Sequence, residues 1–204
     1  MKPKTYKLKR PLDLLMIIAG LLFPLLWPLW FIVIFIIPLL IWIEDRGPIF
    51  YSQNRIGKNK KVFKVIKFRT MIPEAEKTSG AVWSTKDDPR ITRIGHLLRR
   101  TALDEIPQLL NILKGEMSFV GPRAERPELH EKFSKEIPGF DKRLDVTPGL
   151  SGLAQINGSY DLDPKEKLVF DIDYSKKMSL FFDLKIIIVS VFNSISARWD
   201  QPDK

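Results

Sequence analysis

The chain has 204 residues, enough for one membrane element and one compact domain of roughly 150 residues. Its formal charge of +9 and pI near 9.7 suit a protein that lies against anionic lipid or handles anionic substrates. The absence of cysteine excludes disulfides and thiolate catalysis, and two histidines argue against a histidine-rich zinc site. No helix-turn-helix, zinc-finger or RNP pattern accompanies the charge, so nucleic acid is not an expected partner.

The first forty-five residues carry a long apolar run. No residue from Leu14 to Ile43 is charged, and Pro24, Pro28 and Pro38 interrupt this run. A straight helix of that length would rise about 45 Å, whereas the hydrocarbon core of a bilayer is about 30 Å thick. Each proline removes a backbone hydrogen bond, so the run is expected to bend.

Basic residues crowd both ends of this run. Lys7, Lys9 and Arg10 precede it, and Arg46 opens a basic segment that follows it. The positive-inside bias therefore gives no preferred direction across the bilayer, and the simplest solution keeps both flanks on the cytoplasmic face. Residues 1–45 thus predict a re-entrant helix–break–helix hairpin with its break near Pro24. The alternative is one tilted, kinked helix that spans the bilayer.

Residues 46–204 predict a compact domain of short strands and helices, so that the fold class is α/β (mostly α). Three strands are expected, at Ile49–Ser52, Val62–Phe68 and Met117–Val120, with a turn at Gly57–Lys60 between the first two. Three helices are expected, at Ile94–Arg100, Leu103–Leu113 and Arg126–Ile137. Two further stretches, Pro73–Pro89 and Pro148–Gly158, have the composition of loops.

The last predicted element is a helix over Leu180–Trp199. Apolar residues recur along it at three-to-four-residue spacing, at Phe181, Leu184, Ile188, Phe192, Ile195 and Trp199. Such a stripe belongs either to a helix that faces the core or to one that lies in the plane of the lipid headgroups.

The adjacent acids Asp104 and Glu105 are the sharpest local signal for chemistry. Pro107 is tolerated only in a first helical turn, so Asp104 is expected at or near a helix N-terminus. Free N–H groups there, together with the nearby Arg99, keep a carboxylate ionised and favour phosphate. Such an aspartate could attack a phosphoryl group or hold a divalent cation. The alternative is a helix cap with a surface ion pair.

Two further basic segments fit a phosphate-rich ligand. Lys67 and Arg69 alternate with apolar residues as they would on a strand edge, and Arg123 follows the rigid Gly121-Pro122 turn. The planar guanidinium of arginine suits bidentate phosphate binding. No Walker A or Gly-x-Gly-x-x-Gly pattern is present, so a nucleotide would have to be held by these scattered cations.

Taken in order, a series of segments resembles the bacterial sugar transferase family, the monotopic polyprenyl-phosphate phosphoglycosyl transferases. These segments are Lys9–Asp13, Gly47–Phe50, Gln53–Gly57, Lys67–Met71, Asp88–Gly95, Leu103–Gln108, Lys114–Arg123, Pro148–Gly158 and Asp173–Tyr174. They reach from Lys9 almost to the C-terminal helix, and so many ordered motifs together are highly specific. The length resembles the short form of the family, a catalytic unit without additional N-terminal spans.

The resemblance implies an activity: transfer of a phospho-sugar from a UDP-sugar to a polyprenyl phosphate such as undecaprenyl phosphate, with release of UMP. It implies Asp104 as the nucleophile of a covalent phospho-sugar intermediate and Glu105 as its dyad partner; a general-base role toward the lipid phosphate is inferred from placement. Mg²⁺ would bridge Asp104 and phosphate. Arg99 and Arg123 would hold phosphate oxygens, with Lys67 and Arg69 as weaker candidates.

The same resemblance implies a setting. Residues 46–204 would form a cytoplasmic sugar transferase domain on the inner membrane of a bacterium, against anionic lipid, with a homodimer left open. In this family the membrane element is a re-entrant helix broken at a proline, and the resemblance therefore favours the hairpin over the spanning helix.

Three departures from the family pattern stand out. Phe23 replaces the usual serine before Pro24, Ala124 replaces proline after Arg123, and Thr147 replaces a basic residue before Pro148. Arg143 is a candidate substitute for that last cation.

Two rival functions stay open at this point. One is a glycosyltransferase that moves the sugar alone and releases UDP, and the other is a non-enzymatic basic scaffold at the membrane surface. The sequence does not identify the sugar, the polyprenol length or the glycan pathway.

Overall fold

The computed structural model describes residues 6–75, 88–158 and 162–196. Helices predominate among the described elements, and two small two-stranded sheets complete them, so the expected α/β (mostly α) class is confirmed. The expected loop at Pro73–Pro89 falls largely outside the described residues, as does Trp199.

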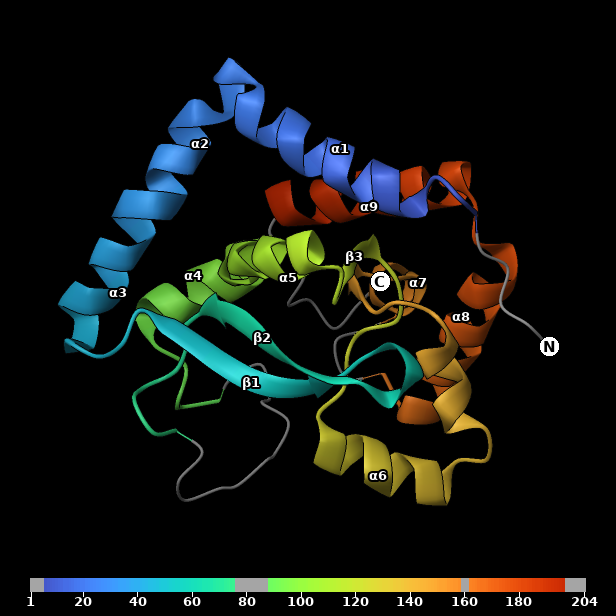
Figure 1. The fold of residues 1–204 in the computed structure, drawn as a ribbon. Coiled ribbons are helices and arrows are strands. Elements are labelled where there is room, and N and C mark those ends of the chain that lie inside the picture. The colour runs from blue at the N-terminus through green and yellow to red at the C-terminus, as the bar shows by residue number, and fades with distance from the viewer. Residues whose placement is uncertain (1–5, 76–87, 159–161, 197–204) are drawn as a thin grey trace.

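The N-terminal apolar run folds as two helical legs that meet at a break (Figure 1). Helix α1 (Lys9–Leu22) ends at Phe23, which is extended with φ −77° and ψ 109°, and a 3₁₀ turn (η1, Pro24–Leu26) follows. The residue before a proline disfavours helical geometry, so the break falls where Pro24 predicts it. The second leg comprises α2 (Trp27–Phe31), a π turn (η2, Ile32–Ile36) and α3 (Ile37–Asp45).

The other two prolines do not break the second leg. Pro28 and Pro38 each lie in the first turn of their helix, where the missing N–H is not needed, and the π turn precedes Pro38. As a result, Pro24–Asp45 forms a helical leg of 22 residues that is long and apolar enough to cross a membrane, by length and composition. The Trp30 indole donates to the carbonyl of Gly20 at 2.8 Å and joins the two legs near the break.

A β-hairpin follows the two N-terminal legs. Strand β1 (Phe50–Ile56) pairs antiparallel with β2 (Val62–Phe68), in a register that sets Phe50 opposite Phe68 and Ile56 opposite Val62. The expected strands and their turn are confirmed, although β1 extends four residues beyond its expected end.

The second sheet is parallel and joins distant segments. Strand β3 (Ser118–Val120) pairs with β4 (Gly149–Ser151). β4 and the short helix α7 (Leu153–Asn157) lie in the stretch Pro148–Gly158 that was expected to be a loop, so that expectation was wrong. Three residues make a strand too short for periodicity to reveal it.

Most expected helices are present, with changed boundaries. α4 (Arg93–Thr101) and α6 (Pro127–Glu136) lie where the sequence predicts them. The single helix expected at Leu103–Leu113 is instead a 3₁₀ helix (η4, Leu103–Gln108) followed by α5 (Leu109–Lys114). Sequence analysis missed the 3₁₀ helix η5 (Phe140–Asp145) and the helix α8 (Pro164–Lys177).

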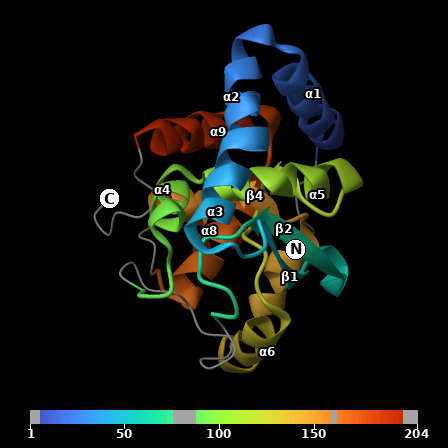
Figure 2. The same cartoon turned by 90° about the vertical axis from the view of Figure 1, so that its left-hand side faces the viewer.

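The C-terminal helix α9 (Leu180–Ile195) begins against the start of α1, where Lys9 pairs with Asp183, and runs beneath the N-terminal legs (Figure 1). Figure 2 shows α9 passing behind α2, with α1 to the right of α2. Its apolar stripe faces outwards, because Phe181, Ile188 and Ile195 are 82%, 67% and 81% exposed. The opposite face buries Ile186 and Asp183. The core-facing alternative for this stripe was therefore wrong.

The N-terminal legs share their core with the rest of the chain. Ile17 of α1 packs with Phe63 and Ile112, and Ile41 of α3 packs with Phe68. The two legs thus rest on the hairpin and on α4 and α5, rather than standing apart. The domain boundary at residue 45 stays a prediction.

Candidate active site

The acid pair lies at the turn between α4 and η4. α4 ends at Thr101, Ala102 takes a left-handed conformation with φ 55°, and the 3₁₀ helix carries Asp104 and Glu105 in its first turn. The expectation that Asp104 lies near a helix N-terminus is confirmed, although Ala102 occupies the cap position and no side chain caps the helix.

Asp104 is an aspartate with a raised pKa. Its side chain is buried. Burial raises the pKa of the Asp104 carboxyl to about 6, and the negative charge of Glu105 adds to the rise, while Lys67, Arg99 and Arg123 oppose it. The carboxylate is therefore ionised at neutral pH, but it is more basic and more poorly solvated than an ordinary aspartate.

Glu105 is held by an ion pair with Arg123. The two N–H groups of the guanidinium approach the Glu105 oxygens at 2.5 and 3.3 Å. Burial alone would raise the pKa of Glu105, but Arg123, with Lys67 and Arg55, outweighs burial and leaves that pKa below its usual value. Neighbouring acids with oppositely shifted pKa values are typical of catalytic sites.

The side chain of Lys67, on β2, is half-buried next to the acid pair. Burial lowers the pKa of its ammonium to about 8, and the charge of Asp104 limits the fall. Its Nζ also lies 5.6 Å from the centre of the Tyr51 ring on the paired strand. The structure thus brings Lys67 to the dyad, where the sequence made it a weaker candidate.

Arg55 belongs to the same group, although sequence analysis did not select it as a site residue. Burial and the charge of Arg123 together lower the pKa of Arg55 to about 10, while Glu125 and Glu105 oppose the change. Its side chain donates to the carbonyl of Ala124 at 3.0 Å. Arg55 and Lys67 lie on one face of the hairpin because Arg55 pairs with Phe63, four residues before Lys67. The predicted turn at Gly57–Lys60 could have revealed this shared face.

Arg99 reaches the site from the last turn of α4. Its Nε donates to the Thr70 hydroxyl at 2.9 Å. Gly95 allows α4 to approach this closely, since a Cβ there would lie 2.1 Å from the Thr70 carbonyl oxygen. Arg99, on α4, and Arg123, in the loop after β3, were both predicted as phosphate contacts. The structure brings both of them near the dyad, from different elements.

Arg69 is engaged elsewhere. Its guanidinium donates to both carboxylate oxygens of Asp45 at 2.5 Å and to the carbonyls of Pro48 and Met71. The side chain is buried. Arg69 joins the end of α3 to the end of β2, and we do not include it among the proposed substrate contacts.

Arg143, the candidate substitute for a cation at Thr147, is also buried. It pairs with Asp171 at 2.8 and 2.9 Å and lies 3.6 Å from Glu125. One of its N–H groups donates to the backbone carbonyl of Arg123 at 3.0 Å. Arg143 thus fixes the loop that carries Arg123 instead of facing substrate.

The dyad offers two neighbouring carboxylates as oxygen ligands for a hard cation. Within the described ranges, no three His, Asp or Glu side chains cluster closely enough to form a metal cage. Mg²⁺ is commonly held by one or two carboxylates together with substrate phosphates, rather than by an all-protein cage. Asp104 and Glu105 therefore fit a magnesium site that substrate phosphate completes.

A surface pocket opens beside β1 and the start of α6. Its lining includes Tyr51, Gln53 and Arg126. Gln53 lies between the positions of Tyr51 and Arg55 on the dyad-facing side of β1. The residues that line it do not include the acid pair, Lys67, Arg99 or Arg123, and its link to the site is the ring of Tyr51, over which Lys67 lies.

Comparison with known proteins shows similarity to one family over nearly the whole chain. The family model described as bacterial sugar transferase matches residues 4–197. A Bacillus subtilis protein, provisionally named an undecaprenyl-phosphate N-acetylgalactosaminyl 1-phosphate transferase, is 51% identical over 67% of this chain and 73% of its own length.

Two longer relatives are similar over most of this chain. The UDP-glucose:undecaprenyl-phosphate glucose-1-phosphate transferase of Escherichia coli is 40% identical over 91% of the chain. An Aeromonas hydrophila UDP-N-acetylgalactosamine-undecaprenyl-phosphate N-acetylgalactosaminephosphotransferase is 36% identical over 90% of it. The chain covers 39% and 43% of these two proteins, respectively. With the family model matching nearly every residue, the chain belongs to the bacterial sugar transferase family.

Proposed function

We propose that the protein transfers a sugar 1-phosphate from a UDP-sugar to a polyprenyl phosphate, such as undecaprenyl phosphate, in two steps. In the first, a carboxylate oxygen of Asp104 attacks the sugar-bearing phosphorus, the bond to the bridging oxygen breaks, and UMP leaves. In the second, a phosphate oxygen of the lipid attacks the same phosphorus and displaces Asp104, which yields a polyprenyl diphosphate sugar. The names of the relatives support this overall reaction.

One observation carries the assignment of the nucleophile: a buried carboxylate of raised pKa with three cations around it. A pKa of about 6 leaves Asp104 ionised yet basic enough to attack phosphorus. The positive charges of Lys67, Arg99 and Arg123 would stabilise the charge on the phosphoryl oxygens as the bonds exchange. Positioning and electrostatics are the main requirements of phosphoryl transfer.

Glu105 is assigned to the dyad as the group that orients Arg123. Its lowered pKa makes it a weak base, so its expected role as general base toward the lipid phosphate stays a prediction. Glu105 and Asp104 would together hold Mg²⁺, which neutralises phosphate charge when it is bound. If that assignment is right, EDTA should abolish covalent labelling and added Mg²⁺ should restore it.

The soluble donor is assigned to the pocket beside β1. Tyr51 in the pocket lies below the ammonium of Lys67, and Lys67 acts on the charge of Asp104. A donor there could place its diphosphate among the cations and its nucleoside or sugar against the strand.

We also propose that the N-terminal legs enter and leave the membrane on one face. Both ends of the apolar run are bound to the same folded unit: Arg10 donates to the Ile112 and Leu113 carbonyls of α5, and Asp45 pairs with Arg69. A spanning helix would separate these ends by the thickness of the bilayer. The exposed apolar residues at the break and on α9 would then lie in the lipid of the cytoplasmic leaflet.

Tags at the two termini test this topology. Tags before Lys2 and after Lys204 should be accessible from the same side, in inside-out membranes and not in intact cells. Accessibility from opposite sides would mean a spanning helix.

Radiolabelled UDP-sugar tests the nucleophile. Asp104→Asn keeps the shape of the side chain but removes the attacking oxyanion, so it should abolish label on the protein and turnover while the melting temperature stays near that of the wild type. Asp173→Asn is the matched control, because Asp173 pairs with Lys177 on the surface. Label on another side chain, or retained turnover, would refute the assignment. Release of UDP instead of UMP would support a glycosyltransferase.

A further inference from the structure

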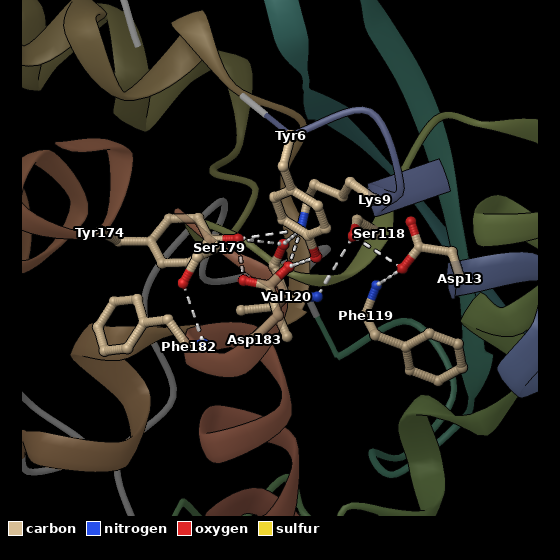
Figure 3. Close-up of polar contacts among 10 residues, drawn as sticks. All are labelled: Tyr6, Lys9, Asp13, Ser118, Phe119, Val120, Tyr174, Ser179, Phe182 and Asp183. Carbon is tan, nitrogen blue, oxygen red and sulfur yellow. Dashed lines mark hydrogen bonds and ion pairs between the residues drawn. The ribbon is translucent and has the colours of Figure 1, made fainter. Parts of the chain in front are cut away.

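A buried polar cluster connects the start of α1 to three other elements (Figure 3). The Lys9 ammonium donates to Asp183 at 2.7 Å, to the Tyr174 hydroxyl at 2.9 Å and to the carbonyl of Val120 at 2.8 Å. These contacts use all three of its N–H donors. Lys9 was expected to be a flanking charge of the membrane run, but it is buried in protein contacts instead.

Asp183 is the acceptor at the centre of this cluster. It is 1% exposed and also accepts from the hydroxyls of Tyr6 at 2.5 Å and Tyr174 at 2.8 Å. Burial and the charge of Asp183 raise the pKa of Tyr174 far above its usual value, so its hydroxyl stays protonated and donates. One lysine and two phenols therefore satisfy the buried carboxylate.

The cluster links the proposed membrane elements to the substrate loop. Lys9 is the first residue of α1, and Asp183 lies in the first turn of α9, whose outer face is apolar. Val120 is the last residue of β3, and Arg123 follows it by three residues. Arg123 in turn holds Glu105 of the dyad.

A second contact reinforces this connection one helical turn along α1. Asp13 accepts from the Ser118 hydroxyl at 3.0 Å and from the Phe119 amide at 3.1 Å. Lys9 and Asp13 are four residues apart and share a helix face. The same face of α1 therefore holds both ends of β3, at Ser118 and at Val120.

β3 does not depend on Lys9 for its own place. It pairs with β4, at Ser118 with Gly149 and Val120 with Ser151, and Arg143 holds the carbonyl of Arg123. Loss of Lys9 would therefore release α1 and α9 from the site more than it would disturb the site itself. A buried ion pair adds little net stability compared with apolar packing, and its best-supported role is to specify geometry.

We propose that Lys9, Asp183 and Tyr174 are positioning residues that set the height of the dyad above the bilayer. This inference rests on the two-step mechanism proposed above. The donor is soluble and can reach the dyad at any height, whereas the lipid phosphate stays at the membrane surface. The cluster should therefore matter for transfer to the lipid and not for formation of the covalent intermediate.

The two steps can be measured separately with the full chain in vesicles of phosphatidylethanolamine and phosphatidylglycerol. The first rate is labelling of the protein by radiolabelled UDP-sugar without lipid acceptor, and the second is loss of that label when undecaprenyl phosphate is added. Lys9→Met should leave the first rate within about twofold and lower the second about tenfold or more, since small misplacements of reacting groups are costly. Lys135→Met, at an exposed ion pair, is the control.

Tyr174→Phe is the milder variant, in case Lys9→Met fails to fold. It removes one hydroxyl and keeps the ring that stacks on Phe182. Its effect should be smaller but equally selective for the second step. Equal losses in both steps would show a purely structural role and overturn the proposal, as would no loss in either.

The depth of the hairpin gives a readout that does not depend on the mechanism. The chain has no cysteine, so Phe23→Cys places one spin label at the exposed break. The Lys9→Met substitution should change the depth of that label in vesicles, and the Lys135→Met substitution should not. An unchanged depth would overturn the positioning role. If the wild type never carries a covalent label, the proposed mechanism fails, and this depth measurement alone decides the role of the cluster.

Discussion

The pH dependence of covalent labelling is the sharpest test of Asp104. Burial raises the pKa of Asp104 from an ordinary 3.8 to about 6, and only the ionised form can attack phosphorus. The kcat/KM for labelling by UDP-sugar should therefore be about half of its plateau near pH 6 and about one tenth near pH 5. An aspartate of ordinary pKa would lose almost nothing over that range.

Two charge variants should move the acidic limb of this pH profile, where labelling falls as the pH drops, in opposite directions. Lys67 lowers the pKa of Asp104, so Lys67→Met should shift the limb to higher pH. Glu105 raises the same pKa, so Glu105→Gln should shift the limb to lower pH. Lys61→Met removes the same charge from an exposed lysine just before β2, which is not among the charges that shift the pKa of Asp104, and should leave the midpoint unchanged.

The basic side of the profile adds a second check. Burial lowers the pKa of Lys67 to about 8, so this cation is lost as the pH rises above that value. Labelling by the wild type should decline there, and the decline should be absent in Lys67→Met. The assay is single-turnover labelling at fixed Mg²⁺ between pH 5 and 9, where the diphosphate diester of the donor does not titrate. A flat acidic limb, or variants that shift it in the same direction, would refute the reasoning.

Three further predictions concern the surroundings of the site. Asp45→Asn strips the buried Arg69 of its partner, so it should lower the free energy of unfolding by about 3 kcal/mol, measured by thermal or urea denaturation. Gly121→Ala would place a Cβ 2.3 Å from the Thr147 carbonyl oxygen, so it should force β3 and β4 apart and reduce both the melting temperature and covalent labelling. Ile188→Glu puts a charge on the exposed face of α9, so it should weaken binding to vesicles in a flotation assay while stability in detergent stays unchanged.

Local patterns predicted the features that local physics controls. Pro24 predicts the break because it affects only its own helix turn, and the short run Val62–Phe68, next to the polar turn at Gly57–Lys60, predicts a strand of a hairpin. The helix start at Asp104 could be predicted for the same reason. By contrast, the sequence does not predict that Leu103–Gln108 is a 3₁₀ helix. Its hydrogen bonds join residues three apart and those of an α-helix join residues four apart, and the spacing of apolar residues over six positions does not distinguish the two.

The role of each cation could not be predicted because distant residues decide it. Arg69 and Lys67 lie two residues apart in one motif, yet Asp45 binds the first and Asp104 acts on the second. Arg143 resembles a candidate phosphate contact in sequence, but Asp171, on α8, binds it. Whether a cation is free to bind substrate or is held in the fold depends on contacts with residues far away in the chain. A single sequence does not show which of these residues pair.

Distant contacts also decide the role of the basic residues before the apolar run, and this affects the predicted topology. The positive-inside rule applies to charges that remain in water or at the headgroups. Lys9 is bound by Asp183, and Arg10 by the carbonyls that end α5, so neither is available to that bias. If the hairpin is re-entrant as proposed, docking of α1 onto the folded domain holds its start on the cytoplasmic face. Removal of the remaining basic side chains of this flank, at Lys2, Lys4 and Lys7, should then leave the topology unchanged, because the contacts of Lys9 and Arg10 would remain.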